Sequence, residues 1–475
     1  MVPLYHMLEA LIQFFTPPYL PTPFHGMAWA FTHGGWLLVG IFLIKYLWWL
    51  WVFELQNAYW ETIERTVIAI HVPKETEDSP KAAENIFDFY RGLRIKRIPT
   101  LYERFWLGEI QPNFSCEIVS RGGTIQFYMW IPKAQRNMVE AGIYAQYPDA
   151  EISEVDDYVK DVPAHYPDPE YDMWGSEVRQ EKHWVYPIKM YEKFEDKLEG
   201  VFKDPLASLF EYMNTLHPGE EAWVQIAILP IENDWHHESA AEAQKLIGVQ
   251  AHEKTGVMRN VLKFFSQFSY DTFAHFFGIN IGEENAHPKS DAPHSLMLFL
   301  SPGEKNVVEE IQLKASKNGF LCKIRLLYVA RKDVFNKRRA MSSLFGTFMQ
   351  FNNLETNSFR PDRYTIVKAE YMFTEWRKDY RKRRFMRAYR ARSMARGACT
   401  YVLNTEELAT LWHFPTITTP SPLVMKAESK KAEPPHILPF VAHTSAHVGV
   451  SRTRERKEKE GDDAGGGLPE NLPFV

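Results

Sequence analysis

The sequence is poor in cysteine, with three in 475 residues: Cys116, Cys322 and Cys399. Their wide separation argues against a disulfide framework and is typical of a protein from a reducing compartment. Several catalytic signatures are also missing. The chain has no GxxxxGK[ST] phosphate loop, no GxSxG nucleophile elbow and no HExxH zinc motif. We therefore expect a protein that is not an enzyme and that holds no cofactor and no metal.

Positive charge is missing from residues 1–44, and a long apolar run begins within this interval. Residues 27–53, MAWAFTHGGWLLVGIFLIKYLWWLWVF, exceed the about 20 apolar residues that cross a bilayer. Late in the run, a lysine stem can carry its ammonium group to the lipid headgroups, and tryptophans crowd together as in an interfacial belt. The expected membrane-anchor residues are Trp36, Lys45, Trp48, Trp49 and Trp51. We predict one transmembrane helix over 27–53.

The charges around this run predict its orientation. No lysine or arginine precedes Lys45, whereas Arg65 and Lys74 follow it. The positive-inside rule then places the N-terminus outside the cell and the large C-terminal body in the cytoplasm. We therefore expect a single-pass protein of the inner cell membrane. Residues 1–26 are expected to be an interfacial leader on the outer leaflet, with a disordered leader as the alternative. A buried core helix is the alternative for the run itself. A cleaved signal peptide is the other alternative, but it would begin with positive charge and end in small residues, and this run shows neither feature.

Residues 60–160 predict a first ferredoxin-like unit with the element order βαββαβ. A β-branched strand comes first, and a helix starts at Ser79-Pro80. Two strands then join in a hairpin at Gly122-Gly123. A second helix and a short strand after Tyr147 complete the unit.

Residues 184–331 predict a second unit with the same element order and a largely helical insertion over 233–292. The expected strands are 186–194, 223–229, 295–300 and 323–329, and the expected helices are 205–216 and 305–315. No residue-level repeat links the two units, so the duplication rests on element order. The fold class expected for the whole chain is therefore α+β.

Residues 333–415 are expected to be a mixed region that contains a strand at 365–372 and a long basic helix at 375–395. A capping box of Asn404 and Glu407 begins a further helix. Residues 416–475 are rich in proline and charge. Such a tail buries too little apolar surface to order itself, so we expect it to be largely disordered.

The basic helix is the strongest chemical signal. Ten of the twenty residues 377–396 are Arg or Lys, against one Asp. A helix that is polar all round bridges solvent or has a partner. We predict a site for nucleic-acid phosphates or anionic lipid heads, formed by Arg377, Lys378, Arg381, Lys382, Arg383, Arg384, Arg387 and Arg390. The alternative is neutralisation by the acidic remainder of the chain or by a partner subunit. Tyr380, Phe385 and Tyr389 could stack bases or anchor the helix.

Two other clusters invite a metal interpretation. His236 and His237 are followed by Glu238, but without a recognised ligand spacing, so a solvated loop pair is the better interpretation. The acids between Asp149 and Asp161 could hold a cation, although such a run is usually a solvated edge.

Several stretches resemble a known family. FSCEIVSRGGTIQFYMWIPKAQRNMVEAGIYAQYPDAEISEVDDY, and further on NTEELATLWHFP and SKKAEPPHILP, are similar to the N-terminal region of membrane-anchored, conjugation-type DNA-transfer ATPases related to type IV secretion systems. The resemblance covers about residues 60–440. Where that family continues into a P-loop motor, this chain has a charged, glycine-containing tail, so no Walker lysine is carried over.

The resemblance implies a stand-alone version of the membrane and accessory portion. We expect a non-catalytic scaffold or adaptor of a DNA-transfer apparatus, which docks a separately encoded P-loop ATPase or another secretion subunit. We also expect a homo-oligomer. The alternative is a membrane tether that binds DNA or anionic lipid through the basic helix.

Overall fold

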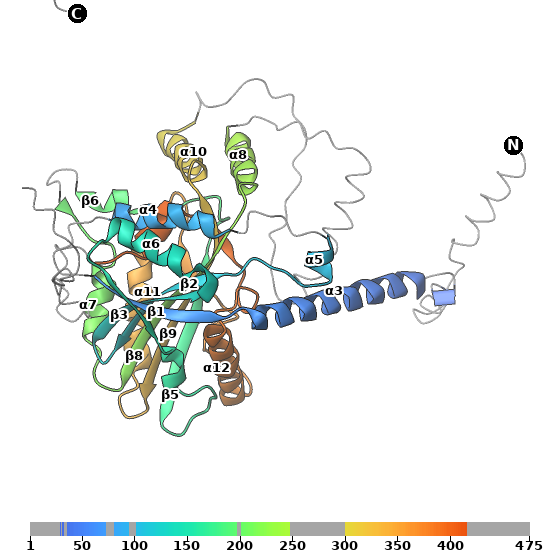
Figure 1. Ribbon diagram of the computed structural model, residues 1–475, viewed down its shortest axis with the longest axis horizontal. Coiled ribbons are helices and arrows are strands. Elements are labelled where there is room, and N and C mark those ends of the chain that lie inside the picture. Colours follow the sequence, from blue (N-terminus) through green and yellow to red (C-terminus); the bar gives the residue numbers. More distant parts are fainter. Residues whose placement is uncertain are drawn as a thin grey trace, which may run out of the picture. The chain divides into compact units, whose positions relative to one another are not determined.

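The computed structural model describes residues 29, 31–32, 36–72, 80–94, 101–196, 201–247 and 300–415 (Figure 1). Within them, helices combine with an antiparallel sheet, which confirms the α+β class. The leader 1–26, the insertion beyond residue 247 and the tail 416–475 lie outside the described residues. So does the strand expected at 295–300, apart from its last residue, which is a bend.

Residues 36–53 of the apolar run lie in helix α3 (Trp36–Thr62), which begins later than the expected start at residue 27 and is long and apolar enough to cross a membrane. Only 6% of its most apolar window is buried, unlike the core helix of a soluble protein. The helix continues past the expected end at Phe53 because Glu54, Leu55 and Gln56 are good helix formers and neither glycine nor proline follows before Thr62. It leads almost directly into the first strand.

Within the described residues, nine strands form one sheet in which all neighbours are antiparallel. The order is β10 (Phe359–Pro361), β5 (Tyr171–Gln180), β9 (Gly319–Arg331), β8 (Glu220–Pro230), β2 (Phe114–Arg121), β3 (Thr124–Pro132), β1 (Arg65–His71) and β4 (Glu151–Val155), with β11 (Tyr401–Asn404) paired to β9. A separate ribbon joins β6 (Glu195–Asp196) to β7 (Val201–Phe202).

The first half of the sheet follows the expected succession of elements. Along the chain, β1, α4 (Pro80–Tyr90), β2, β3, α6 (Arg136–Gln146) and β4 follow one another. In space the strands lie in the order β4-β1-β3-β2. The hairpin turns at Gly122 and Gly123, whose φ angles of 54° and 91° lie in the left-handed region that favours glycine.

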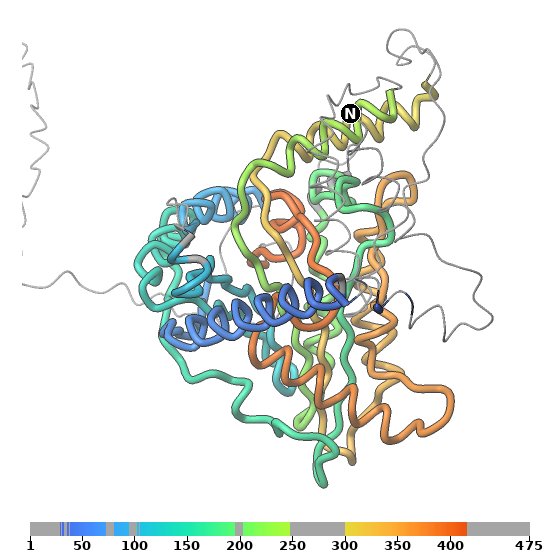
Figure 2. The backbone as a smooth tube through the Cα atoms, turned by 90° about the vertical axis from the view of Figure 1, so that its right-hand side faces the viewer, coloured from blue at the N-terminus to red at the C-terminus, as the bar shows by residue number. Residues whose placement is uncertain are grey.

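The second half has the same succession. Its second and third elements lie at the expected helix 205–216 and strand 223–229, whereas the other four come from other residues than expected. This half consists of β5, α7 (Ala207–Asn214), β8, β9, α11 (Lys337–Met349) and β10, with the spatial order β10-β5-β9-β8. Helices α8 (Trp235–Leu246) and α10 (Pro302–Ala315) lie between β8 and β9 in the chain and pack side by side (Figure 2). The two halves meet where β2 pairs with β8, with Ile118 opposite Val224.

Two expected strands are wrong. The stretch 186–194 contains a bend, irregular backbone and a 3-10 helix at Tyr191–Phe194, and 365–372 consists of a turn, bends and irregular backbone. The strand next to β9 is instead β5, whose sequence YDMWGSEVRQ interrupts its apolar pattern with charges. A charged residue is tolerated there because Glu177 of β5 is paired with Arg325 of β9 inside the protein.

Helices cover both faces of the sheet. On one face, Phe127 of β3 packs against Phe210 of α7 and against Trp412 after α13 (Thr405–Leu411). Helices α4, α6 and α11 lie on this face too. On the other face, Trp223 of β8 contacts Tyr389 of α12 (Thr374–Arg390), the darker orange helix that crosses the strands obliquely in Figure 2.

The segment 401–414 is buried throughout. Its capping box of Asn404 and Glu407 is confirmed, and Glu407 also pairs with Lys314 of α10 at 2.9 Å, with both side chains fully buried. The stretch NTEELATLWHF is thus part of the hydrophobic core of the body.

Candidate polyanion-binding surface

Helix α12, at residues 374–390, matches the predicted basic helix in its position and lies on the sheet by one narrow face. Phe385, Met386 and Tyr389 are buried. A Cβ at Gly175 of β5 would lie 2.5 Å from the Phe385 ring, so the glycine lets this ring approach the strand. Phe385 and Tyr389 therefore anchor the helix to the body, whereas Tyr380 is 50% exposed.

Three of the eight predicted binding residues form contacts within the protein. Lys382 pairs with Asp172 of β5 at 2.6 Å, and Lys378 pairs with Glu375 at 2.8 Å. The Arg381 guanidinium donates to the carbonyl oxygens of Ile366 and Lys368. Lys382 is therefore neutralised by the body and Lys378 by its own helix, whereas Arg381 holds the segment before the helix through uncharged carbonyl groups.

Another part of the predicted site faces outward. The side chains of Arg383, Arg384 and Arg387 are exposed, and those of Arg377 and Arg390 are half-buried. Among the residues that the structure describes, no acidic side chain forms a salt bridge with any of these five. The spacing of Arg383, Arg387 and Arg390 continues a stripe that begins with two exposed rings, Trp376 and Tyr380, stacked at 6.0 Å.

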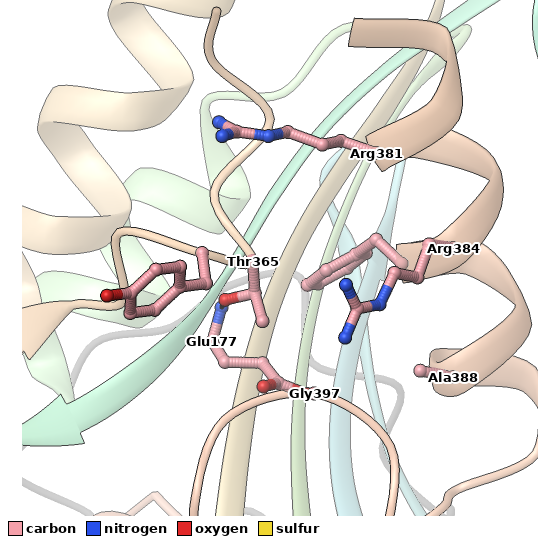
Figure 3. Close-up of a pocket in the computed structure, with 8 residues that line it drawn as sticks. Glu177, Thr365, Arg381, Arg384, Ala388 and Gly397 are labelled. Atoms are coloured by element: carbon pink, nitrogen blue, oxygen red, sulfur yellow. Dashed lines mark hydrogen bonds between the residues drawn. The ribbon is translucent and has the colours of Figure 1, made fainter. Parts of the chain in front are cut away.

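A small cavity lies between α12 and strand β5 (Figure 3). Glu177, Thr365, Arg381, Arg384 and Gly397 are among its lining residues. Its volume is about 20 Å³, which suffices for about one water molecule. The cavity therefore offers no room for an organic ligand, and binding by α12 must use its outer face.

Below α12 runs a buried polar stripe, formed by Glu117, Gln225, Arg325 and Glu177 at matching positions of the neighbouring strands β2, β8, β9 and β5. Gln225 Nε2 donates to Glu117 Oε1 at 2.9 Å. Arg325 donates to Gln225 Oε1 at 3.0 Å and to Glu177 Oε1 at 2.8 Å. The charges are thus connected by hydrogen bonds from strand to strand, as buried charges require.

The segment 391–398, which follows α12, covers this stripe. Arg392 is 1% exposed and binds Glu117 at 3.0 Å and Asp157 at 2.5 Å. Gly397 has a φ of 105°, and a Cβ there would meet the Glu177 carboxylate at 2.1 Å. The backbone amide of Ala398 donates to the same carboxylate. The stripe therefore fixes the C-terminal end of α12.

The pKa shifts of two buried charged residues agree with a role of the polar stripe in fixing the C-terminal end of α12. Burial would raise the pKa of Asp157, but its hydrogen bonds with Arg392 and the charge of Arg392 outweigh burial and hold the pKa below its ordinary value. Lys323 donates to the carbonyl oxygens of Met394 and Arg396, at 2.6 and 3.0 Å, and its burial lowers its pKa to about 8.

The histidine pair and the acidic run, which could have held a metal ion, have other surroundings in the structure. His236 and His237 lie in α8, not in a loop, and no group of three or more metal-ligating side chains occurs in the described part of the chain. Among the acids, Asp157 binds Arg392, Asp161 pairs with Arg121 at 2.9 Å, and Glu154 pairs with Arg136.

The membrane-anchor residues all lie on α3. Trp36, Lys45, Trp48 and Trp51 are exposed, and Trp49 is half-buried. The segment that directly follows α12 lies close to the end of α3, because one ring, Trp130 of β3, contacts both. Trp60 of α3 is 6.4 Å from this ring, and the Arg392 guanidinium is 5.3 Å from it. Figure 1 shows α12 running crosswise to α3 beside its C-terminal end.

Sequence reasoning missed the polar stripe. A signal was present, because Glu117 and Arg325 are charged residues inside apolar strands, FSCEIVSR and GFLCKIRLLYVAR.

A search of curated proteins gives no match. Residues 56–427 match the model of a family described as "Domain of unknown function (DUF8128)", and since this match spans most of the chain, the chain belongs to that family.

Proposed function

We propose that this protein is a single-pass, non-catalytic membrane adaptor whose helix α12 binds the anionic lipid headgroups of the leaflet from which α3 emerges. The N-terminus lies outside and the body lies in the cytoplasm, at the inner cell membrane. The observation that carries the proposal is a set of exposed arginines that form no salt bridge with any described residue, on a helix whose end lies beside the end of α3.

Distance along α3 supports lipid as the polyanion. Trp60 follows the end of the apolar run at Phe53 by seven residues, or about 10 Å of helix. The headgroup layer is about 5–8 Å thick, and the Debye length at physiological ionic strength is about 8 Å. The end of α12 thus lies within reach of the surface potential of the leaflet. At about 1 kcal/mol for each basic residue near an anionic surface, Arg383, Arg384 and Arg387 would contribute about 3 kcal/mol.

The body would act as the docking platform of this adaptor. We infer two ferredoxin-like units joined edge to edge at β2 and β8. The inference is supported by the shared succession βαββαβ and by the strand orders β4-β1-β3-β2 and β10-β5-β9-β8. The second unit would then begin at β5 and end at β10, with α8 and α10 in its insertion.

Reconstitution of the full chain in nanodiscs tests the lipid proposal. We expect Tm to be higher with anionic than with zwitterionic lipid, and the gain to fall as salt rises. The double variant Arg383→Gln, Arg387→Gln should lose the gain. The matched control Lys332→Gln, Arg338→Gln removes two exposed cations outside α12 and should keep it. A gain that survives the α12 variant contradicts the proposal, and DNA binding by α12 without any lipid effect would favour the nucleic-acid alternative.

A scaffold role in a DNA-transfer apparatus is the second candidate, supported by the resemblance to conjugation-type ATPases. The stretch NTEELATLWHF, which precedes the motor in those proteins, is here buried in the body, so a separately encoded motor would dock close to the platform. A pull-down of the full chain from native membranes should recover a P-loop ATPase. Recovery of other copies of the chain alone would contradict this role.

A further inference from the structure

A short helix beside α3 is the strongest remaining feature. Helix α5 (Leu101–Phe105) is followed by Trp106 and Leu107, and this segment 101–107 lies against the second half of α3. The Trp106 ring is 6.0 Å from Trp48 and 5.0 Å from Trp51, edge to face with Trp51. Gly108 brings the backbone so close that a Cβ there would lie 2.5 Å from the Leu55 carbonyl.

The outer side of this segment is apolar and exposed. Tyr102 is 61% exposed, Trp106 is 51% and Leu107 is 52%. These side chains continue the exposed aromatic surface of α3, where Trp48 is 45% and Trp51 is 39% exposed. An exposed contiguous patch of this kind marks a contact with a membrane or a protein.

The position along α3 favours lipid over a protein partner. Trp48 and Trp51 precede Phe53, the end of the apolar run, by five and two residues, so Trp106 lies about 3–8 Å inside that end. Trp and Tyr rings prefer this depth, where an apolar body meets a polar edge. Arg94, Lys96 and Arg97 precede the segment in sequence, as basic residues do beside anionic headgroups.

We propose that the segment 101–107 is a second membrane-contacting element, an interfacial wedge that inserts Trp106 and Leu107 into the boundary between headgroups and acyl chains. The wedge fixes the depth of α3, because its rings are packed against α3 on one side and bounded by lipid on the other. This inference rests on the proposed membrane anchorage. It adds a second membrane contact to α3, one that no periodic pattern in the sequence predicts.

Fluorescence quenching in nanodiscs tests the wedge with the full chain. An environment-sensitive fluorophore is attached to Leu107→Cys in a Cys399→Ser background, since Cys116 and Cys322 are buried. We expect a blue-shifted emission that lipid brominated near the headgroup end of its chains quenches more strongly than lipid brominated near the chain terminus. If the Leu107 variant fails to fold, Tyr102→Cys reports on the same surface.

Two control positions separate the wedge from the anchorage. A label at Leu47→Cys on α3 should be quenched by lipid, and a label at Leu354→Cys, which is 93% exposed on the body, should not be. Quenching at Leu47 without quenching at Leu107 or Tyr102 overturns the wedge alone. Loss of quenching at Leu47 overturns the anchorage and the wedge together.

The effect on depth has its own test. In the double variant Trp106→Gln, Leu107→Gln, the wedge loses its apolar surface. We expect a label at Leu50→Cys to become more accessible to aqueous iodide, with a red-shifted emission. Unchanged accessibility would overturn the role of the wedge in fixing the depth of α3.

Discussion

Replacing Arg392 by methionine leaves two carboxylates without their cation. Arg392 contacts both oxygens of Glu117, at 3.0 and 3.1 Å, and both oxygens of Asp157, at 2.9 and 2.5 Å. Asp157 is 24% exposed, so water can replace the lost contacts. Glu117 is fully buried, so its charge stays uncompensated. Breaking a buried pair by removing one partner costs about 3–5 kcal/mol.

The lower end of this range applies here. Glu117 keeps three neutral donors, from Ser115, Gln225 and Tyr158, at 2.6, 2.9 and 2.8 Å. We therefore expect Arg392→Met to reduce the free energy of unfolding by about 3 kcal/mol. Denaturant unfolding of the detergent-solubilised chain, followed by tryptophan fluorescence, measures this loss.

Two further variants decide whether the buried charge is the cause. Adding Glu117→Gln to Arg392→Met removes that charge and should restore at least about 1 kcal/mol. Arg383→Met on the exposed side of α12 should change stability by no more than about 0.5 kcal/mol. A loss below about 1 kcal/mol for Arg392→Met, or no restoration by the second substitution, would refute the reasoning.

Three further predictions concern other buried or tightly packed positions. Gly397→Ala should cost about 2–4 kcal/mol, because a φ of 105° and the Glu177 carboxylate leave no room for a Cβ, whereas Gly346→Ala, in open space on α11, should stabilise by up to about 1 kcal/mol; urea unfolding of both variants measures this. The pKa of Lys323 is lowered to about 8 by burial, so the folded chain binds fewer protons than the unfolded chain up to about pH 10.4. Stability should therefore rise by about 2 kcal/mol between about pH 7 and 9.5, and Lys323→Met should flatten this rise in unfolding curves. Lys314→Met should cost about 3 kcal/mol in the same assay because it leaves Glu407 buried without its cation, and an unchanged Tm would contradict this.

Local patterns in the sequence were enough for much of the fold. The apolar run, the hairpin at Gly122 and Gly123, the Asn404 capping box and the basic helix each depend on residues within a few positions of one another. Hydrophobic periodicity, turn chemistry and caps act over that range, so these elements lie close to where they were expected. The succession βαββαβ in the first half belongs to the same class.

The tertiary structure alone decided which charges are available. Glu177 finds its cation 148 positions away, at Arg325, and Glu117 finds its cation 275 positions away, at Arg392. No local pattern shows such pairing, so β5 was missed as a strand. For the same reason the sequence could not separate Lys382, which is held by Asp172, from Arg387, which faces solvent. The sequence determined that α12 is basic, and packing determined which of its cations remain free to bind, because a charge within the protein needs a partner that only the fold brings near.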